Sequence, residues 1–401
     1  MRIKIANSRG APALGITILL ASLSMISPLS IDTFLPSLPT IAQEYGIGDW
    51  KVQQIITAYL LPFACFSLVH GPLSDALGRR RVVIGGLVLY TAGSIGCFLA
   101  PSFGALLFFR VLQGLAAGIG PTVARAVVRD MFDGANAQKL MSSMMLVFSL
   151  APAVAPVIGG WVHVSLGWRW VFGMLVVLGG VLMVACMLLL PETHPPARRT
   201  PFKVRVLIGN CWRVATGKAF FLLAISAALA IASLFIYIGS APAIILKRWG
   251  LRETQFHYIF IPVVLGFMIS SFVSGRMAGV VERSTQLRIG FGLLWFSAAF
   301  GALAHSVSDH VPLLIVQLLW FCMAGGAQLT YPVLSLEMID MHPKTRGAAA
   351  SVQSFIALGI GALVMGMVAP MLHGDLKLLA WISLAGGVVA WLTWRAGNRL
   401  R

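Results

Sequence analysis

One carboxylate stands inside a stretch of the chain that is otherwise uncharged. Asp32 lies in the segment SPLSIDTFLPSLP, residues 27–39, and no charged residue occurs between position 10 and Asp32. An ionised side chain in hydrocarbon costs at least about 2.5 kcal/mol, so such residues usually face a bundle interior or a watery cavity, where a carboxylate can bind and release a proton. The alternative is a helix-end residue at the membrane interface, because about 20 helical residues already span about 30 Å.

Arg110 is a cation in another long apolar stretch. If both stretches are helices of one bundle, Arg110 and Asp32 could form a charge pair or share a watery cavity. An aspartate beside an arginine favours its ionised form, whereas a buried aspartate favours its protonated form. A carboxylate that alternates between these surroundings is a proton carrier. We therefore expect Asp32 to carry the proton and Arg110 to hold and tune the anion.

A few other polar side chains also fall within apolar stretches. A substrate pocket combines apolar surface with a small number of polar groups. The candidates for such a cavity are Tyr59, Gln113, Tyr237, Gln328, Tyr331 and Gln353. Each of them could equally form a hydrogen bond between two helices.

The elements that must position these residues are membrane-spanning helices. Of the 401 residues, 58% are hydrophobic and 11% are charged, where a soluble domain carries about 25% charged residues. The mean hydropathy of +0.87 indicates an integral membrane protein. Uncharged runs long enough to cross a bilayer as helices recur along the chain. The predicted spans are 12–36, 50–73, 82–100, 102–128, 138–164, 168–190, 218–246, 254–275, 287–307, 311–336, 345–371 and 375–394.

The basic residues are concentrated in the connections on one side of the predicted spans. The formal net charge of +17 would fit nucleic-acid binding in a soluble protein. Here, however, most of the 30 Lys and Arg residues fall in connections on the side of the N-terminus. Because cytoplasmic connections carry the excess of Lys and Arg, both termini are predicted to be cytoplasmic. The expected partner is the lipid bilayer and not a nucleic acid.

One long polar connection divides the chain into two halves. It begins with PETHPPARRTPFKVR, and its prolines and basic residues predict a cytoplasmic linker at 191–217 between bundles at 1–190 and 218–401. The stretch HGPLSDALGRRRVVIGG from His70 aligns without gaps with SGRMAGVVERSTQLRIG from Ser274, so that Arg79 meets Arg283. Duplicated halves around a central site are a known transporter plan. The predicted fold is an all-α membrane protein with twelve transmembrane helices in two pseudo-symmetric six-helix bundles.

Three motifs carry a resemblance to a known family. GPLSDALGRRR at 71–81 resembles the cytoplasmic signature between the second and third helices of the major facilitator superfamily. RVLQG from Arg110 resembles the fourth-helix motif, and APAVAPVIGGW from Ala151 resembles the fifth-helix motif of the antiporter branch, with Ala155 where that motif has Gly. With IDTFLPSLP and YIGSAP added, the chain is most similar to drug:proton antiporters of the bicyclomycin and chloramphenicol resistance type.

This resemblance implies a function and roles for the motif residues. It implies proton-coupled export of amphipathic drugs across a bacterial-type inner membrane by alternating access. The cytoplasmic signature would act as a gate, although its arginines could merely set topology; its residues are Gly71, Asp75, Gly78, Arg79 and Arg80. The antiporter-type helix motif, for which plain helix packing is the alternative, consists of Pro152, Pro156, Gly159 and Gly160. Some similar antiporters carry a second acid where this chain has Ser24, which favours neutral or singly charged substrates.

Other classes of protein fit the sequence less well. The five cysteines have no paired spacing and the eight histidines are scattered, so neither a metal site nor a cofactor is expected. An H-E-x-x-H motif and a G-x-x-x-x-G-K-[ST] loop are both absent, which argues against an enzyme and against a nucleotide-driven pump. Glu337 and Asp340 are expected to serve the gate, and the protein is expected to be a monomer. A proton-coupled uptake symporter for a small metabolite is the alternative function.

Overall fold

The computed structural model describes residues 14–132, 134–308, 311–372 and 374–400, and within them every regular element is a helix. The basic residues that precede position 10, and His310, lie outside this part. The α-helices are α1 (Leu14–Asp32), α2 (Leu38–Glu44), α3 (Asp49–Leu77), α4 (Arg79–Phe98), α5 (Phe103–Ala117), α6 (Ile119–Met131), α7 (Gly134–Leu166), α8 (Trp168–Leu189), α9 (Val204–Ala215), α10 (Lys218–Pro242), α11 (His257–Met277), α12 (Arg283–Val307), α13 (Leu313–Asp340), α14 (Arg346–Leu363), α15 (Ala369–Met371) and α16 (Leu376–Arg399). Short 3-10 turns η1 (Leu35–Ser37), η2 (Pro196–Arg198) and η4 (Glu253–Gln255), and π-helical turns η3 (Ala243–Arg248) and η5 (Val364–Val368), complete the described elements.

These helices agree with the predicted spans. In the described residues, 11 helical stretches are long and apolar enough to cross a membrane, and a shorter apolar stretch, Leu150–Leu166, lies in α7 where the fifth span is predicted. Many large apolar side chains are exposed along these helices, as expected for surfaces that face lipid. The fold is therefore that of a multi-span helical membrane protein.

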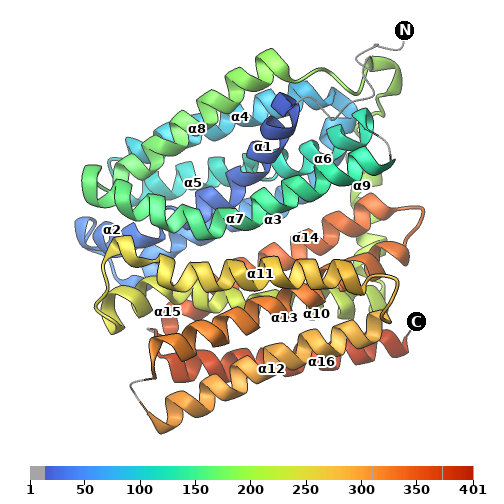
Figure 1. The fold of residues 1–401 in the computed structure, drawn as a ribbon. Helices are drawn as coiled ribbons and strands as arrows, with labels where there is room; N and C mark the ends of the chain where they lie inside the picture. The colour runs from blue at the N-terminus through green and yellow to red at the C-terminus, as the bar shows by residue number, and fades with distance from the viewer. Residues whose placement is uncertain (1–13, 133, 309–310, 373, 401) are drawn as a thin grey trace.

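The long helices run side by side, and the two parts of the chain occupy different regions. In Figure 1 the helices up to α8 lie in the upper part and those from α10 onward in the lower part. The two parts are joined mainly by the packing of α3 against α14 and of α7 against α11. We call the right-hand end in Figure 1, where α4 begins, the Arg79 end, and the opposite end the Lys247 end.

The first span is longer than its sequence predicts, and this changes the position of Asp32. The span covers Gly15–Glu44, so it ends eight residues after position 36. Its helix is interrupted just after Asp32, because Pro36 has no N–H to donate to the Asp32 carbonyl four residues earlier. The chain resumes as η1 and α2. Asp32 is therefore the last residue of α1, and it lies inside the longer apolar stretch Gly15–Glu44, which continues beyond it through η1 and α2.

The linker contains a helix that its sequence does not predict. Pro195, Pro196 and Pro201 indicate an irregular connection, yet Val204–Ala215 forms α9. The prolines end just before the helix, and the twelve residues that follow contain none. A short amphipathic pattern beside three prolines is a weak signal, and α9 is held by packing against α14 and α10.

Candidate functional site

Arg110 is the centre of a buried polar network in the first half of the chain. Its side chain, on α5, is fully buried. The guanidinium donates to the carbonyl of Ser30 on α1 at 3.1 Å, to the carbonyl of Ile55 on α3 at 3.2 Å and to Oε1 of Gln113 at 2.9 Å. Gln113 in turn donates to Oγ of Ser94 on α4 at 2.7 Å. Arg110 thus ties four helices together through neutral acceptors.

Aromatic rings enclose the same guanidinium. The carbon atom Cζ of Arg110 lies 4.4 Å from the ring centre of Tyr59, 4.5 Å from that of Phe34 and 5.8 Å from that of Phe172. A cation held against ring faces in a desolvated site gains on the order of 2 kcal/mol. Its Nη2 atom is buried and has no hydrogen-bond partner. The network therefore holds a buried positive charge with which no carboxylate of the described residues forms an ion pair.

Asp32 lies near this network but does not join it. Its side chain is buried, with 5% of the residue exposed. Within the described part of the chain, its carboxylate forms no ion pair with Arg110 or any other residue and no hydrogen bond. The structure therefore brings the two residues into one region, because Arg110 bonds to the carbonyl of Ser30, two residues before Asp32 on α1. The predicted charge pair between them does not form in this conformation. Asp32 is thus a buried acid whose carboxylate has no bonding partner among the described residues.

Gly159 and Gly160 of α7 permit two close approaches. A Cβ atom on Gly159 would lie only 1.7 Å from the carbonyl oxygen of Thr33, the residue after Asp32. A Cβ atom on Gly160 would lie 2.1 Å from the carbonyl oxygen of Glu253, in the second half of the chain. Because only Gly fits at such distances, these two residues hold α7 against the break in the first span on one side and against η4 on the other. Pro152 and Pro156 lie in the same helix.

The residues of the cytoplasmic signature form a cluster at the Arg79 end. Arg79 pairs with Asp75 at 2.5 Å and with Asp130 of α6 at 3.2 Å. Its backbone N–H, at the start of α4, donates to Glu192 of the linker at 2.9 Å, so this carboxylate neutralises the positive end of the helix dipole. Gly78 has a φ of +99°, which favours glycine, and a Cβ there would collide with Glu192.

The other two signature residues lie apart from this cluster of charges. Arg80 donates to the carbonyl of Met187 near the end of α8, 2.5 Å away. A Cβ on Gly71 would meet nothing within 4 Å, so close packing does not require glycine there. In the described part of the chain, the signature forms its bonds with the first half and the linker. It forms none with the second half.

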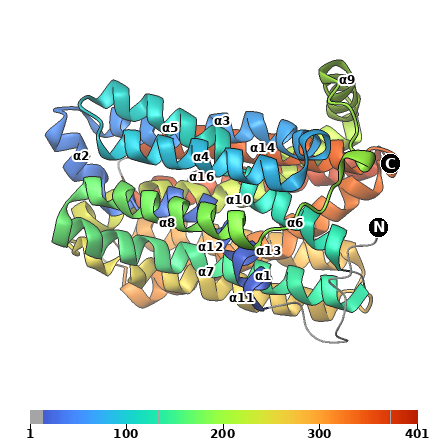
Figure 2. The same ribbon diagram turned by 90° about the horizontal axis from the view of Figure 1, so that it is seen from above.

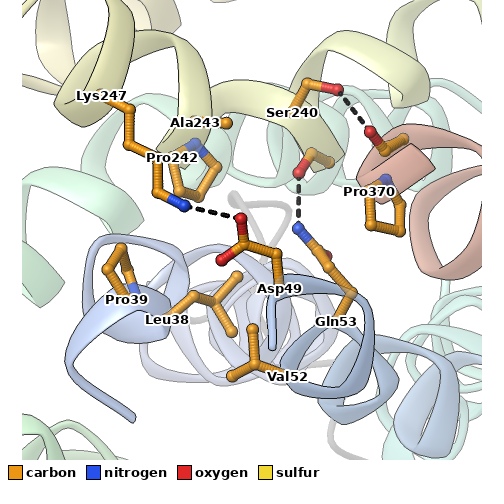
Figure 3. Close-up of a pocket in the computed structure, with 12 residues that line it drawn as sticks. Leu38, Pro39, Asp49, Val52, Gln53, Ser240, Pro242, Ala243, Lys247 and Pro370 are labelled. Atoms are coloured by element: carbon orange, nitrogen blue, oxygen red, sulfur yellow. Dashed lines mark hydrogen bonds and ion pairs between the residues drawn. The ribbon is translucent and has the colours of Figure 1, made fainter. Parts of the chain in front are cut away.

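Direct side-chain bonds between the halves occur at the opposite end. Among the described residues, three hydrogen bonds or ion pairs join residues 14–189 to residues 218–399. Gln53 Nε2 donates to the carbonyl of Gly239 at 2.9 Å and Gln54 Nε2 donates to that of Gly366 at 2.8 Å. Lys247 Nζ lies 2.6 Å from Asp49 Oδ2. Figure 3 shows the small pocket at this interface, with the Asp49–Lys247 and Gln53–Gly239 contacts drawn across it.

Backbone packing supports the same closure. A Cβ on Gly366 of η5 would lie 1.7 Å from Oγ1 of Thr57 on α3, so the two helices touch at this level. The packing of α3 against η5 and of α7 against η4 lies at the same end. The two parts of the chain are therefore fastened together at the Lys247 end.

The structure separates the six predicted cavity residues into two groups. Tyr59 and Gln113 are fully buried in the Arg110 network and are helix-joining residues in this conformation. The remaining four are in the second half. Gln328 of α13 donates to Ser271 of α11 at 2.8 Å, Gln353 of α14 accepts from Ser335 of α13 at 2.8 Å, and the Tyr237 ring of α10 packs on Trp320 at 5.1 Å.

One of these side chains has an unused polar atom. The Nε2 atom of Gln353 is buried without a hydrogen-bond partner among the described residues, and Tyr331 of α13 is partly exposed. A ligand between the halves could use such groups. In the described residues, no group of three or more His, Cys, Asp or Glu side chains is placed to hold a metal ion.

The sequence does not predict several residues that form contacts at these sites. Asp130 and Glu192 complete the Arg79 cluster, and Gln53, Gln54 and Lys247 fasten the two halves. Asp130 lies just after the fourth predicted span, five residues after Arg125, and a charged residue at such a position is typical of a loop. For the glutamines the acceptors are backbone carbonyls, which no residue type marks.

Comparison with known proteins agrees with the motifs. The family model described as Major Facilitator Superfamily matches residues 20–366. An uncharacterized MFS-type transporter of Bacillus subtilis, YdgK, is 29% identical over 90% of this chain and 90% of its own length. A bicyclomycin resistance protein homolog of Haemophilus influenzae is 25% identical over 88% of each chain. A chloramphenicol resistance protein of Pseudomonas aeruginosa is 27% identical over 77% of this chain and 73% of its own.

A solved structure shows the same fold. A D-xylose–proton symporter superposes with a TM-score of 0.72 at 12% identity, covering 95% of this chain and 97% of the symporter. At this identity the likeness concerns the fold alone. The span pattern, the motifs at Gly71, Arg110 and Ala151 and the family match lead to one conclusion: this chain belongs to the major facilitator superfamily of membrane transporters.

Proposed function

We propose that this protein exports amphipathic drugs or related small molecules across a bacterial-type inner membrane in exchange for protons. The observation that carries the proposal is the Asp32 carboxylate, which is buried within the first span and has no partner in the described part of the chain. A membrane-embedded acid with no structural bond to lose is available for proton coupling. The resistance proteins to which this chain is similar support the choice of drugs as substrates.

In the proposed cycle, the protonation of Asp32 follows its access to water. Burying an unpaired ionised carboxylate is unfavourable, so Asp32 binds a proton when the surrounding helices close. When water or a drug reaches the site, the ionised form is solvated and the proton leaves. Arg110 contributes a fixed positive charge and positions α1 through the Ser30 carbonyl, so that it tunes Asp32 without a direct bond in this conformation.

Access alternates by movement of two bundles, residues 1–190 and 218–401, linked by residues 191–217. We assign the Arg79 end, rich in basic residues, to the cytoplasm and the Lys247 end to the outer side. The present conformation is then closed outside by the bonds of Gln53, Gln54 and Lys247. Opening outward requires these bonds to break.

Arg79 and its bonded partners move as one unit in this cycle. The bonds of Arg79 to Asp75, Asp130 and Glu192 join α3, α4, α6 and the linker, so these elements move together. The tight contact of Gly159 with Thr33 transmits movements of α7 to the segment next to Asp32. Tyr237, Gln328, Tyr331 and Gln353 of the second half are the proposed polar groups for substrate.

Proton movement in everted membrane vesicles tests the proposal. With an acidified lumen, adding chloramphenicol or a lipophilic cation should release protons from vesicles that contain the unaltered protein. The Asp32→Asn variant should lose this release while keeping its amount in the membrane, because Asn has the same shape and cannot carry a proton. Glu282→Gln is the matched control, since Glu282 is an exposed acid before α12.

The three possible outcomes separate the alternatives. Equal proton release by the unaltered protein and Asp32→Asn would show that Asp32 does not couple transport. No release by either, with the protein present in the membrane, would exclude these compounds as substrates and favour uptake of a metabolite with protons. Release lost only in Asp32→Asn supports drug:proton exchange at that carboxylate.

A further inference from the structure

The linker helix α9 has an apolar stripe that the described part of the chain leaves exposed. Val204, Ile208 and Trp212 follow one another at intervals of four residues, so they share one face of the helix. Their exposed fractions are 53%, 60% and 70%. The buried residues of α9, Cys211 and Val214, lie on the adjacent face. The apolar surface of α9 is therefore wider than its contact with the bundle.

Basic residues border this stripe and have no acidic partners. Arg205 and Arg213 lie on the polar side of α9 and are exposed, and Lys203 and Lys218 flank the helix. None of the four forms an ion pair in the described part of the chain. The sequence contains no Asp or Glu from Thr193 to Arg252, so no acidic residue of this segment compensates these charges. The surface is suited to an anionic partner.

The position of α9 places it at the level where a membrane begins. Only Thr216 and Gly217 separate it from α10, whose membrane-spanning stretch starts at Lys218. In Figures 1 and 2, α9 lies at the Arg79 end, and Figure 2 shows it projecting sideways from the bundle beyond α3 and α14. A helix in this place extends over the lipid that surrounds the protein.

We infer that α9 is an interfacial helix that binds the anionic phospholipid headgroup layer. Its stripe of Val204, Ile208 and Trp212 enters the boundary between headgroups and acyl chains, where Trp is favoured. Arg205 and Arg213 contact the phosphate groups, to which clustered basic residues are attracted. This contact anchors the linker to the membrane surface. The anchored linker includes Glu192, whose carboxylate accepts a hydrogen bond from the N–H of Arg79, the first residue of α4.

Fluorescence quenching in lipid nanodiscs tests the inference on the full chain. The native cysteines are replaced, and a small fluorophore is attached through Ile208→Cys or through Gly209→Cys, its exposed neighbour on the polar side. Lipids with brominated acyl chains should quench the label at position 208 and leave the label at 209 largely unquenched. Equal, weak quenching at both positions would overturn the inference, and it is also the result if a second copy of the chain covers the stripe.

A second comparison tests the charge requirement. Replacing phosphatidylcholine by phosphatidylglycerol in the nanodiscs should increase quenching at position 208. Arg205→Gln with Arg213→Gln should abolish this increase, whereas Arg288→Gln, which removes an exposed charge on α12, should leave it intact. Quenching that does not depend on phosphatidylglycerol would overturn the assignment of an anionic lipid.

Discussion

Arg79, the first residue of α4, reaches Asp130 near the end of α6, with 3.2 Å between Nε and Oδ2. The second half contains the equivalent pair. Arg283, the first residue of α12, lies 3.0 Å from Asp340, the last residue of α13. The gapless alignment of the two halves matches Arg79 with Arg283, and the structure gives both arginines the same kind of partner. The two pairs differ in burial, because the Arg79 side chain is 9% exposed and that of Arg283 is 53% exposed.

This difference predicts unequal costs for two matched substitutions. Arg79→Ala should lower the free energy of unfolding by about 2 kcal/mol, since the nearly buried Arg79 side chain donates to Asp75, Asp130 and Ser74, and Asp130 would keep only Thr193 as a donor. Arg283→Ala should cost less than about 1 kcal/mol, as is usual for an exposed ion pair. Thermal unfolding of the two purified variants in detergent measures both. Equal shifts of the midpoint would contradict the assigned role of burial.

Substitutions at the Lys247 end should change which side of the protein is open. Gln53→Leu with Gln54→Leu removes two hydrogen bonds between the halves, each worth about 1 kcal/mol, and should favour the conformation that is open at this end by roughly tenfold or more. Lys247→Ala alone should have a small effect, because both partners of that ion pair are about half exposed.

Thiol labelling measures this shift. A cysteine at Ser240, which is buried beside the pocket in Figure 3, should react faster with a membrane-impermeant reagent in the double glutamine variant. The same cysteine in the Lys247→Ala background is the control for a weak contact. Unchanged labelling in the double variant would mean that the two glutamines do not hold this end closed.

The sequence predicts the helices well and their contacts poorly. Spans are marked by long apolar runs, so their number and approximate limits follow from hydropathy. The first span is predicted too short because Pro36 resembles an end, whereas the structure continues through it as η1 and α2. The helix α9 is missed because prolines precede it.

The sequence identifies the buried charged residues of the site but not the partners that they contact. Asp32 and Arg110 stand out because charge is rare in spans, and both prove to be buried. Their predicted pairing does not occur in this conformation, because Arg110 donates to carbonyl and amide oxygens that residue types do not reveal. Tyr59 and Gln113 are read from sequence as cavity residues for the same reason, since a buried polar side chain suits either role.

The geometry around Arg110 predicts that lysine cannot replace it. Arg110→Lys keeps the charge but loses the planar fork that reaches Ile55, Ser30 and Gln113 together and that packs between aromatic rings. We expect a loss of about 2–4 kcal/mol in unfolding free energy, because buried acceptors lose their donors. Thermal unfolding measures the loss, and Arg288→Lys, at an exposed position, is the matched control. A variant as stable as the unaltered protein would show that charge alone suffices at this position.

The close approach of α7 to the first span makes Gly159 intolerant of even one methyl group. A Cβ there would lie 1.7 Å from the carbonyl oxygen of Thr33, which is backbone and cannot swing aside. Gly159→Ala should therefore push α7 away from the segment that carries Asp32 and cost at least about 1–3 kcal/mol. Gly180→Ala on α8 is the matched control, since nothing lies within 4 Å of a Cβ at that position, and it should be neutral or slightly stabilising. Because the affected contact adjoins Asp32, drug-induced proton release should fall in Gly159→Ala vesicles and persist in Gly180→Ala vesicles. Full stability and full proton release in Gly159→Ala would show that α1 and α7 do not need this contact.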